Sequence, residues 1–277
     1  MADIYDLHCH STASDGALSP TELVQRAFQK GVTALALTDH DTTAGLVEAE
    51  CCAKLLGIRL IQGIELSTSW ENKCFHIVGL NINPNYPPLA EASHNLLNIR
   101  LQRARIIAEK LAKNGINGAF EAVFDTVGKG MITRSHFADY LVSQNHVNSH
   151  QAAFDRYLGK GKPAYCSTEW AKLEEAIGWI VESGGIAVLA HPLRYQLTAI
   201  WMRKLLTAFK AAGGLAIEVV TGHYNPDEIR RLASYAINYQ LAGSVGSDFH
   251  SPENPWLELG KLSPLPKTVK PVWELLN

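Results

Sequence analysis

Two histidines near the N-terminus have the spacing of a metal-binding pair. His8 and His10 lie in the segment 6–16, which is predicted to be the end of a β-strand running into a loop. Side chains alternate between faces along a strand, so the two imidazoles point the same way, about 7 Å apart, and can reach one ion. Asp15 could add an oxygen ligand from the loop. An H-x-H pair alone is a weak signal, so the rest of the chain must supply the other ligands.

Further histidines and carboxylates lie at or near the ends of later predicted strands. Imidazole is the commonest metal ligand in proteins, and divalent ions also accept carboxylates. The full set is His8, His10, Asp15, His40, Glu65, His76, His191, Asp248 and His250. These nine residues are more than one ion can bind, and their number fits a site for two or three ions. A nitrogen and oxygen set without thiolate suits Mn²⁺, Fe²⁺ or Zn²⁺ better than Ca²⁺ or a structural zinc.

The elements that must position these residues alternate between strand and helix. Short apolar runs predict strands over 33–38, 59–64, 75–80, 186–190, 215–220 and 242–246, after a first strand at the N-terminus. Helices between them begin with capping motifs, as at Ser19-Pro20-Thr21-Glu22 and Asn225-Pro226-Asp227-Glu228. This alternation is typical of an α/β protein with a parallel sheet or barrel, in which the active site lies at the C-terminal strand ends.

A long segment without strand signal separates the fourth and fifth strands. Residues from about 94 to 157 predict only helices, and a linker rich in Gly and Lys follows at 159–163. We therefore expect a barrel formed by residues 1–93 and 166–277, and a helical insertion, 94–165, that acts as a substrate lid. The first helix of the insertion carries Arg100, Arg103, Arg105, Lys110 and Lys113. We interpret this basic run as a solvated face, with a basic lid over an anionic substrate as the alternative.

Composition and charge limit what the protein can bind and where it can be located. A formal net charge of −2 provides no basic surface for sequence-independent binding of long DNA, but it allows a small anionic substrate. No apolar run has the length of a membrane span, and the N-terminus does not look like a signal peptide. The five cysteines are odd in number and lack zinc-type spacing, which indicates free thiols in a reducing cytoplasm. The oligomeric state has no readable signal.

The order of these motifs resembles the PHP (polymerase and histidinol phosphatase) superfamily. D-L-H-C-H-S and S-D-G are followed by T-D-H-D, G-I-E, a histidine in the next strand, A-H-P and G-S-D-F-H. The resemblance covers the whole chain and implies a distorted (β/α)7 barrel with a helical insertion and a trinuclear metal centre. It places His8, His10, Glu65 and Asp248 on one ion. It makes Glu65 the bridge to a second ion held by His76 and His191, and it assigns Asp15, His40 and His250 to the third. The three ions would be Mn²⁺, with Fe²⁺ or Zn²⁺ as alternatives.

The branch that this sequence resembles consists of stand-alone phosphoesterases. They remove the 3′-phosphate of nucleoside 3′,5′-bisphosphates, or degrade short 5′-phosphorylated RNA from the 5′ end. The implied mechanism is attack on phosphorus by a hydroxide that bridges two metals, with Glu65 and Asp248 positioning it. Two alternatives stay open: a histidinol-phosphate phosphatase, and a non-catalytic PHP module that binds metal for its structure, in which lost ligands would be expected.

Three residues are candidates for contact with the substrate. Arg134 and Arg194 could bind phosphate, because a guanidinium meets phosphate through two parallel hydrogen bonds. His223 follows a predicted strand end and could contact the phosphate or protonate the leaving group. The aromatic residues of the insertion could stack a base, but their helical spacing favours a packing role; they are Phe120, Phe124, Phe137, Tyr140, Phe154 and Tyr157.

Overall fold

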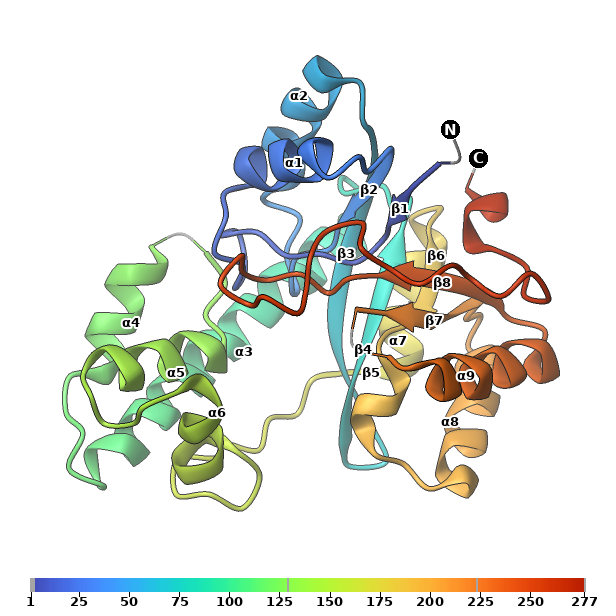
Figure 1. Ribbon diagram of the computed structural model, residues 1–277. Coiled ribbons are helices and arrows are strands. Elements are labelled where there is room, and N and C mark those ends of the chain that lie inside the picture. Colours follow the sequence, from blue (N-terminus) through green and yellow to red (C-terminus); the bar gives the residue numbers. More distant parts are fainter. Residues whose placement is uncertain (1–2, 129, 223, 277) are drawn as a thin grey trace.

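The computed structural model describes residues 3–128, 130–222 and 224–276, and its centre is a curved sheet (Figure 1). Hydrogen-bonded neighbours follow the order β1-β2-β3-β4-β6-β7-β8, with β5 paired to β3 outside this path. The strands are β1 (Tyr5–Asp6), β2 (Ala34–Leu37), β3 (Arg59–Trp70), β4 (Lys73–Leu80), β5 (Ala171–Lys172), β6 (Ile186–Leu189), β7 (Ala216–Thr221) and β8 (Ala242–Gly246). Most neighbours are parallel, and β4 is antiparallel to both β3 and β6.

The two ends of the sheet meet and nearly close it into a barrel. The Leu7 amide donates to the Val245 carbonyl at 3.0 Å, and the Asp248 amide donates to the His8 carbonyl at 2.7 Å. The predicted α/β barrel is therefore confirmed. This closure also has a consequence for the site, because it sets the segment after β1, with His8, directly beside the segment after β8, with Asp248.

Strands β3 and β4 form a longer hairpin than the sequence predicts. The apolar runs suggest 59–64 and 75–80, whereas the strands extend to Trp70 and begin at Lys73. The turn residues Glu71 and Asn72 have φ of 49° and 57°, as a two-residue hairpin turn of the primed type requires. The extension of β3 contains polar residues, so it does not have the apolar pattern from which the strands were predicted. As a result, Glu65 lies inside a strand rather than at a strand end.

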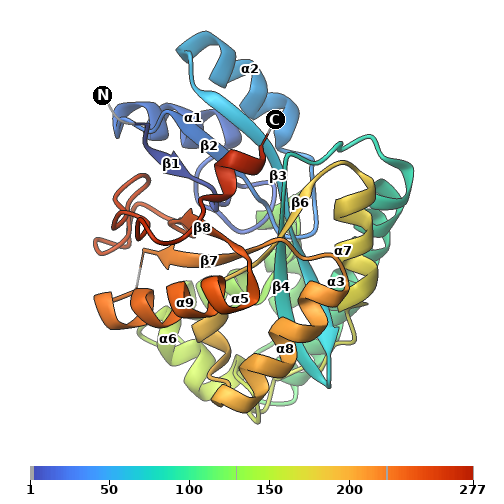
Figure 2. The same ribbon diagram turned by 90° about the vertical axis from the view of Figure 1, so that its right-hand side faces the viewer.

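Helices cover the outside of the barrel (Figures 1 and 2). They are α1 (Pro20–Gln29), α2 (Leu46–Leu56), α7 (Leu173–Glu182), α8 (Ala199–Ala211) and α9 (Pro226–Tyr239), with short helices η2 (Pro192–Tyr195) and η3 (Val272–Leu275). The capping boxes predicted at Ser19 and Asn225 are both present at helix N-termini. Among the helices in the described ranges, none is long and apolar enough to cross a membrane.

The remaining helices form the insertion beside the barrel (Figure 1). They are α3 (Pro87–Ala112), α4 (Ala119–Val127), α5 (Arg134–Ser143), α6 (His150–Ala153) and the π-helical turn η1 (Phe154–Leu158). The first half of α3 packs Leu89 and Leu96 into the barrel core, while its second half packs Ile107 and Leu111 into a separate apolar cluster. Helix α3 therefore joins the two cores, and the division at residues 94 and 165 stays a prediction.

Candidate metal centre

The nine residues singled out by sequence converge at one end of the barrel, around the carboxylate of Glu65. Its Oε1 atom lies 3.0 Å from His76 Nδ1 and 3.0 Å from His191 Nε2. Its Oε2 atom lies 2.8 Å from His40 Nδ1 and 3.3 Å from His8 Nε2. Strand β3 holds Glu65 fully buried. Because its two oxygens face different histidines, this carboxylate can bridge two cations.

A second group forms where β1 and β8 close the barrel. The Nε2 atoms of His8 and His10 are 3.1 Å apart, and Asp248 Oδ1 lies 3.4 Å and 3.2 Å from them. Asp248 has a φ of 56°, a backbone conformation that non-glycine residues seldom adopt. Such a conformation persists only where the surroundings impose it, and here it aims the carboxylate at both imidazoles.

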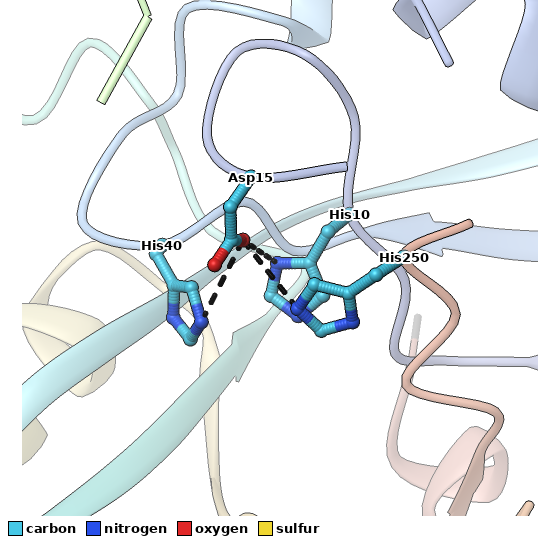
Figure 3. A group of neighbouring side chains, drawn as sticks. All are labelled: His10, Asp15, His40 and His250. Atoms are coloured by element: carbon cyan, nitrogen blue, oxygen red, sulfur yellow. Dashed lines mark ion pairs between the residues drawn. The ribbon is translucent and has the colours of Figure 1, made fainter. Parts of the chain in front are cut away.

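A third group surrounds Asp15 (Figure 3). Asp15 Oδ1 lies 3.4 Å from His250 Nε2, 3.8 Å from His40 Nε2 and 3.9 Å from His10 Nδ1. Ligand atoms of these four residues all lie within 4.8 Å of one another. The loop that carries Asp15 is held by Asp39, which accepts hydrogen bonds from the backbone and side chain of Ser11, both at 2.7 Å.

Unsatisfied polar atoms show that this donor set fits cations. Asp15 Oδ1 and His191 Nδ1 are buried and lack a hydrogen-bond partner among the described residues, and His40 Nδ1 and Glu65 Oε2, although 2.8 Å apart, form no hydrogen bond either. A buried acceptor without a partner costs about 1–3 kcal/mol, more if charged, so native proteins rarely leave several together. Imidazole and carboxylate donors at these separations are those of a transition-metal site. The residues therefore fit a centre for divalent ions.

The carboxylates of the site are held ionised. Burial alone would raise the pKa of Glu65, but the neighbouring histidines, His40 and His8 foremost, hold it well below its ordinary value. Burial likewise opposes ionisation of Asp15 and Asp248. His40 lowers the pKa of Asp15, and Arg194 lowers that of Asp248, in each case to well below the ordinary value. Three negative charges are thus buried together.

The histidines divide into two classes. Burial lowers the pKa of His10 to about 3 and also lowers that of His191, so both are neutral at pH 7. Burial would lower the pKa of His76 and His250 as well, but Glu65 raises the first to about 10 and Asp15 raises the second to about 9. For His8, Glu218 is the strongest of three carboxylates that overcome burial and raise the pKa well above its ordinary value.

Glu218 is a buried site residue that the sequence analysis missed. Its Oε1 atom lies 2.6 Å from His8 Nδ1, and its Oε2 atom accepts the backbone N–H of His191 at 2.6 Å. A carboxylate that holds the far nitrogen of a metal-binding histidine fixes the tautomer and makes the ring a better ligand. The available signal was a single glutamate inside the buried apolar strand β7.

We expect the Glu218→Gln substitution to weaken metal binding by about 10- to 100-fold, the usual effect of removing such a supporting group. The amide keeps the shape but can present an N–H₂ group to His8, which disfavours the tautomer needed for metal binding. Titration with a competing fluorescent chelator would measure this change. Glu182→Gln, on α7, is a suitable control, because Glu182 bonds only Tyr86 among the described side chains. Equal affinity in wild type and Glu218→Gln would contradict a supporting role.

Arg100 contradicts the interpretation of the basic run on α3 as a solvated face. Its side chain is buried and donates to Asp41 Oδ2 through Nε at 2.8 Å and to Ser67 Oγ through Nη2 at 3.0 Å. Asp41 also accepts the backbone N–H of Ser67 at 2.6 Å. This pair attaches the insertion to the segment that carries His40, because Asp41 is its sequence neighbour.

A cavity of about 560 Å³ opens from the metal centre between the β3–β4 hairpin and the insertion. Its lining includes His40 and His76 of the metal centre, together with Arg134, Phe154 and Trp170. Of the predicted substrate contacts, Arg134 thus lines the cavity. Arg194 instead forms an ion pair with the Oδ2 atom of Asp248. His223 lies outside the described residues.

The aromatic residues of the insertion do not all have the same environment. Phe137 and Tyr157 are buried in the core of the insertion, in agreement with a packing role. Phe154 is only partly buried and lines the cavity, where its ring lies 5.5 Å below the Arg134 guanidinium.

Comparison with known proteins gives consistent matches. The sequence model of the PHP domain matches residues 6–185. A 5′-3′ exoribonuclease of Haemophilus influenzae is 49% identical, over 99% of each chain. A 3′,5′-nucleoside bisphosphate phosphatase of Chromobacterium violaceum is 43% identical over 100% of this chain and 97% of its own. A solved structure of an amidohydrolase from Chromobacterium violaceum, with bound sulfate and no metal, superposes with a TM-score of 0.94 at 43% identity, covering 99% of this chain and 95% of that one.

Proposed function

The chain belongs to the PHP domain family, and from this premise we propose that it is a metal-dependent phosphoesterase acting on small nucleotides. It would remove the 3′-phosphate of nucleoside 3′,5′-bisphosphates, degrade short 5′-phosphorylated RNA from the 5′ end, or do both. Full-length relatives, 43% and 49% identical, carry these activities in their names. The observation that carries the proposal is Glu65, whose two oxygens face separate histidines beside a cavity lined with arginines.

We further propose that the centre takes three divalent ions, Mn²⁺ first, with Fe²⁺ or Zn²⁺ as alternatives. The three groups described above supply the ligands, which are His8, His10, Glu65 and Asp248; Glu65, His76 and His191; and Asp15, His40 and His250. When bound, the ions would lower the pKa of water to near neutrality and neutralise charge on the phosphoryl oxygens. The five free cysteines are consistent with the cytoplasmic location that we predict.

The protein's own residues position the reactants. Glu65 and Asp248 would act by fixing the ions rather than by transferring protons, since both are ionised and buried. Arg194 neutralises the second oxygen of Asp248 and lies at the exposed rim, where it can also meet an incoming phosphate. Arg134 would bind phosphate within the cavity. Because α3 and α5 supply one wall of this cavity, we propose that the insertion is the substrate lid.

The test is phosphate or nucleotide release by Mn²⁺-loaded protein from adenosine 3′,5′-bisphosphate, a short 5′-phosphorylated RNA and histidinol phosphate. We expect turnover of the bisphosphate, the RNA or both, and none of histidinol phosphate. The same RNA with a 5′-hydroxyl is the matched control, because it lacks only the terminal phosphate.

Two other outcomes would contradict the proposal, and each would favour one of the alternative functions. Turnover of histidinol phosphate alone would identify a histidinol-phosphate phosphatase. No turnover of any substrate, with metal content established by elemental analysis, would favour a module that binds metal for its structure.

A further inference from the structure

The insertion contacts two of the loops that carry ligands of the proposed third ion. These ligands are Asp15, His40 and His250 (Figure 3). Shortly before α5, the Met131 N–H donates to the carbonyl of Ala13 at 3.0 Å, two residues before Asp15. On α3, the buried Arg100 pairs with Asp41, the residue after His40. The insertion therefore reaches two ligands of one ion through separate contacts.

Asp41 connects Arg100 to the backbone around His40. The Asp41 N–H donates to the Glu65 carbonyl at 2.9 Å, and its Oδ1 atom accepts the Ser67 N–H at 2.6 Å. Asp41 has a φ of 56°, a conformation that persists in a non-glycine residue only where the surroundings impose it. Arg100 belongs to these surroundings, because its Nε donates to Asp41 Oδ2 at 2.8 Å. Loss of this bond would let the backbone relax and displace His40.

The two contacts meet in the short segment 130–132 of the insertion. The Ile132 carbonyl accepts a hydrogen bond from Arg100 Nη1 at 3.4 Å, and the preceding residue, Met131, makes the bond to Ala13. Gly130 lies so close to the same loop that a Cβ atom there would be 2.8 Å from the Thr12 carbonyl oxygen. The segment is therefore packed directly between Arg100 and the loop that carries Asp15.

We propose that the insertion is a structural part of the site for the third ion, with Arg100 as a positioning residue that acts on His40 through Asp41. This inference rests on the proposed function, which includes that ion. It gives the insertion a role besides forming one wall of the substrate cavity. Coupling between two sites is reciprocal, so binding of the ion must also strengthen the attachment of the insertion to the barrel.

The first experiment counts the bound ions. Equilibrium dialysis against a fixed concentration of free Mn²⁺, followed by elemental analysis, should give three ions in the wild type. Arg100→Met should bind the third ion about 10- to 100-fold more weakly, the usual effect of removing a group that supports a ligand. Arg100→Lys should have a smaller effect, because it keeps the charge but loses the planar set of donors.

Arg103→Met is the matched control on the same helix. Both arginines line the cavity and lie over the ring of Trp170, with Cζ 5.0 Å from its centre for Arg100 and 5.2 Å for Arg103. Only the bond to Asp41 distinguishes Arg100 in this comparison. Arg103→Met should therefore bind the third ion as the wild type does.

A second variant changes the other contact without removing a buried charge. In Gly130→Ala, the added methyl group would meet the Thr12 carbonyl oxygen and push the segment away from the loop that carries Asp15. The same ion should bind more weakly, and thermal melting will verify that both variants are folded. Wild-type affinity for the third ion in both Arg100→Met and Gly130→Ala would overturn the proposal.

Combination with ligand variants identifies the ion that is lost. In Asp15→Asn, which lacks a ligand of the third ion, Arg100→Met should cause no further loss, because both changes remove the same ion. In His76→Ala, which lacks a ligand of the second ion, Arg100→Met should remove one more. Equal weakening of all ions by Arg100→Met would indicate a general loss of structure and would also overturn the proposal.

Hydrogen exchange tests the coupling in the other direction. Mn²⁺ should slow amide exchange in the segment 130–143 of the wild type by about 5- to 150-fold, the usual range of coupling between two sites. It should have little effect on this segment in Asp15→Asn. Equal protection in both proteins would contradict the coupling.

These measurements do not depend on turnover, so they separate this inference from the proposed function. If the expected losses of metal occur while no nucleotide is hydrolysed, the coupling stands and the proposed reaction fails. If nucleotides are hydrolysed and neither Arg100→Met nor Gly130→Ala changes the metal content, the reaction stands and the coupling is wrong.

Discussion

The Glu65→Gln variant is expected to bind fewer metal ions and to lose about 10³-fold in kcat, the scale observed when a group that stabilises transition-state charge is removed. Glutamine has the same shape, but it is neutral and keeps one acceptor oxygen. In the protein, one oxygen of Glu65 faces His76 and His191, and the other faces His40 and His8. An amide can satisfy only one of these sides, and its N–H₂ group would face imidazole nitrogens on the other.

Elemental analysis of the purified variant, with kcat measured on adenosine 3′,5′-bisphosphate, tests this expectation. Glu109→Gln is a matched control, since Glu109 is exposed on the outer part of α3 and does not line the cavity. Metal content should fall below that of wild type in Glu65→Gln and stay unchanged in Glu109→Gln. Wild-type metal content and activity in Glu65→Gln would exclude Glu65 as the bridging ligand.

The sequence predicted the candidate site better than it predicted its surroundings, and the reason is local geometry. His8 and His10 lie two residues apart in the extended segment that follows β1, and this segment is adjacent, in the closed barrel, to the one that carries Asp248 and His250. Parallel strands that end at one rim bring their terminal residues together whatever the loops do. A list of ionisable residues at strand ends therefore contains most of the cluster. Glu65 was included only because its apolar run stops there, although its strand continues.

The supporting residues could not be found in this way, because their roles depend on how distant elements pack. Glu218 is a lone glutamate on β7, and its contact with His8 is fixed by barrel closure. Arg100 and Arg103 belong to a basic run that looks like a solvated face. Whether such a run faces water or a cavity depends on how α3 sits against the β3–β4 hairpin, and helical periodicity carries no information on that placement.

Metal loading is expected to release up to three protons at pH 7, so that the overall binding constant for the full set of ions rises by as much as about 10³-fold per pH unit. In the metal-free protein, the ionised carboxylates of Glu65, Asp15 and Asp248 lie among three protonated histidines, His8, His76 and His250, and Asp248 also pairs with Arg194. Carboxylates raise the pKa of His8 well above its ordinary value, that of His76 to about 10 and that of His250 to about 9. These imidazoles are therefore charged at pH 7 and must become neutral to bind a cation. The effect should fade as the pH rises past 9 to 10, where they are already neutral.

Calorimetric titration with Mn²⁺ in two buffers of different ionisation enthalpy counts the released protons directly. Glu218→Gln should release fewer protons than wild type, because Glu218 is the carboxylate that contributes most to the raised pKa of His8. Release of less than about one proton by wild type at pH 7 would mean that the histidines are already neutral without metal. The buried charge of Glu65, Asp15 and Asp248 would then have to be balanced by other means. The proton count thus tests whether the centre exchanges protons for metal ions, as its three buried carboxylates require.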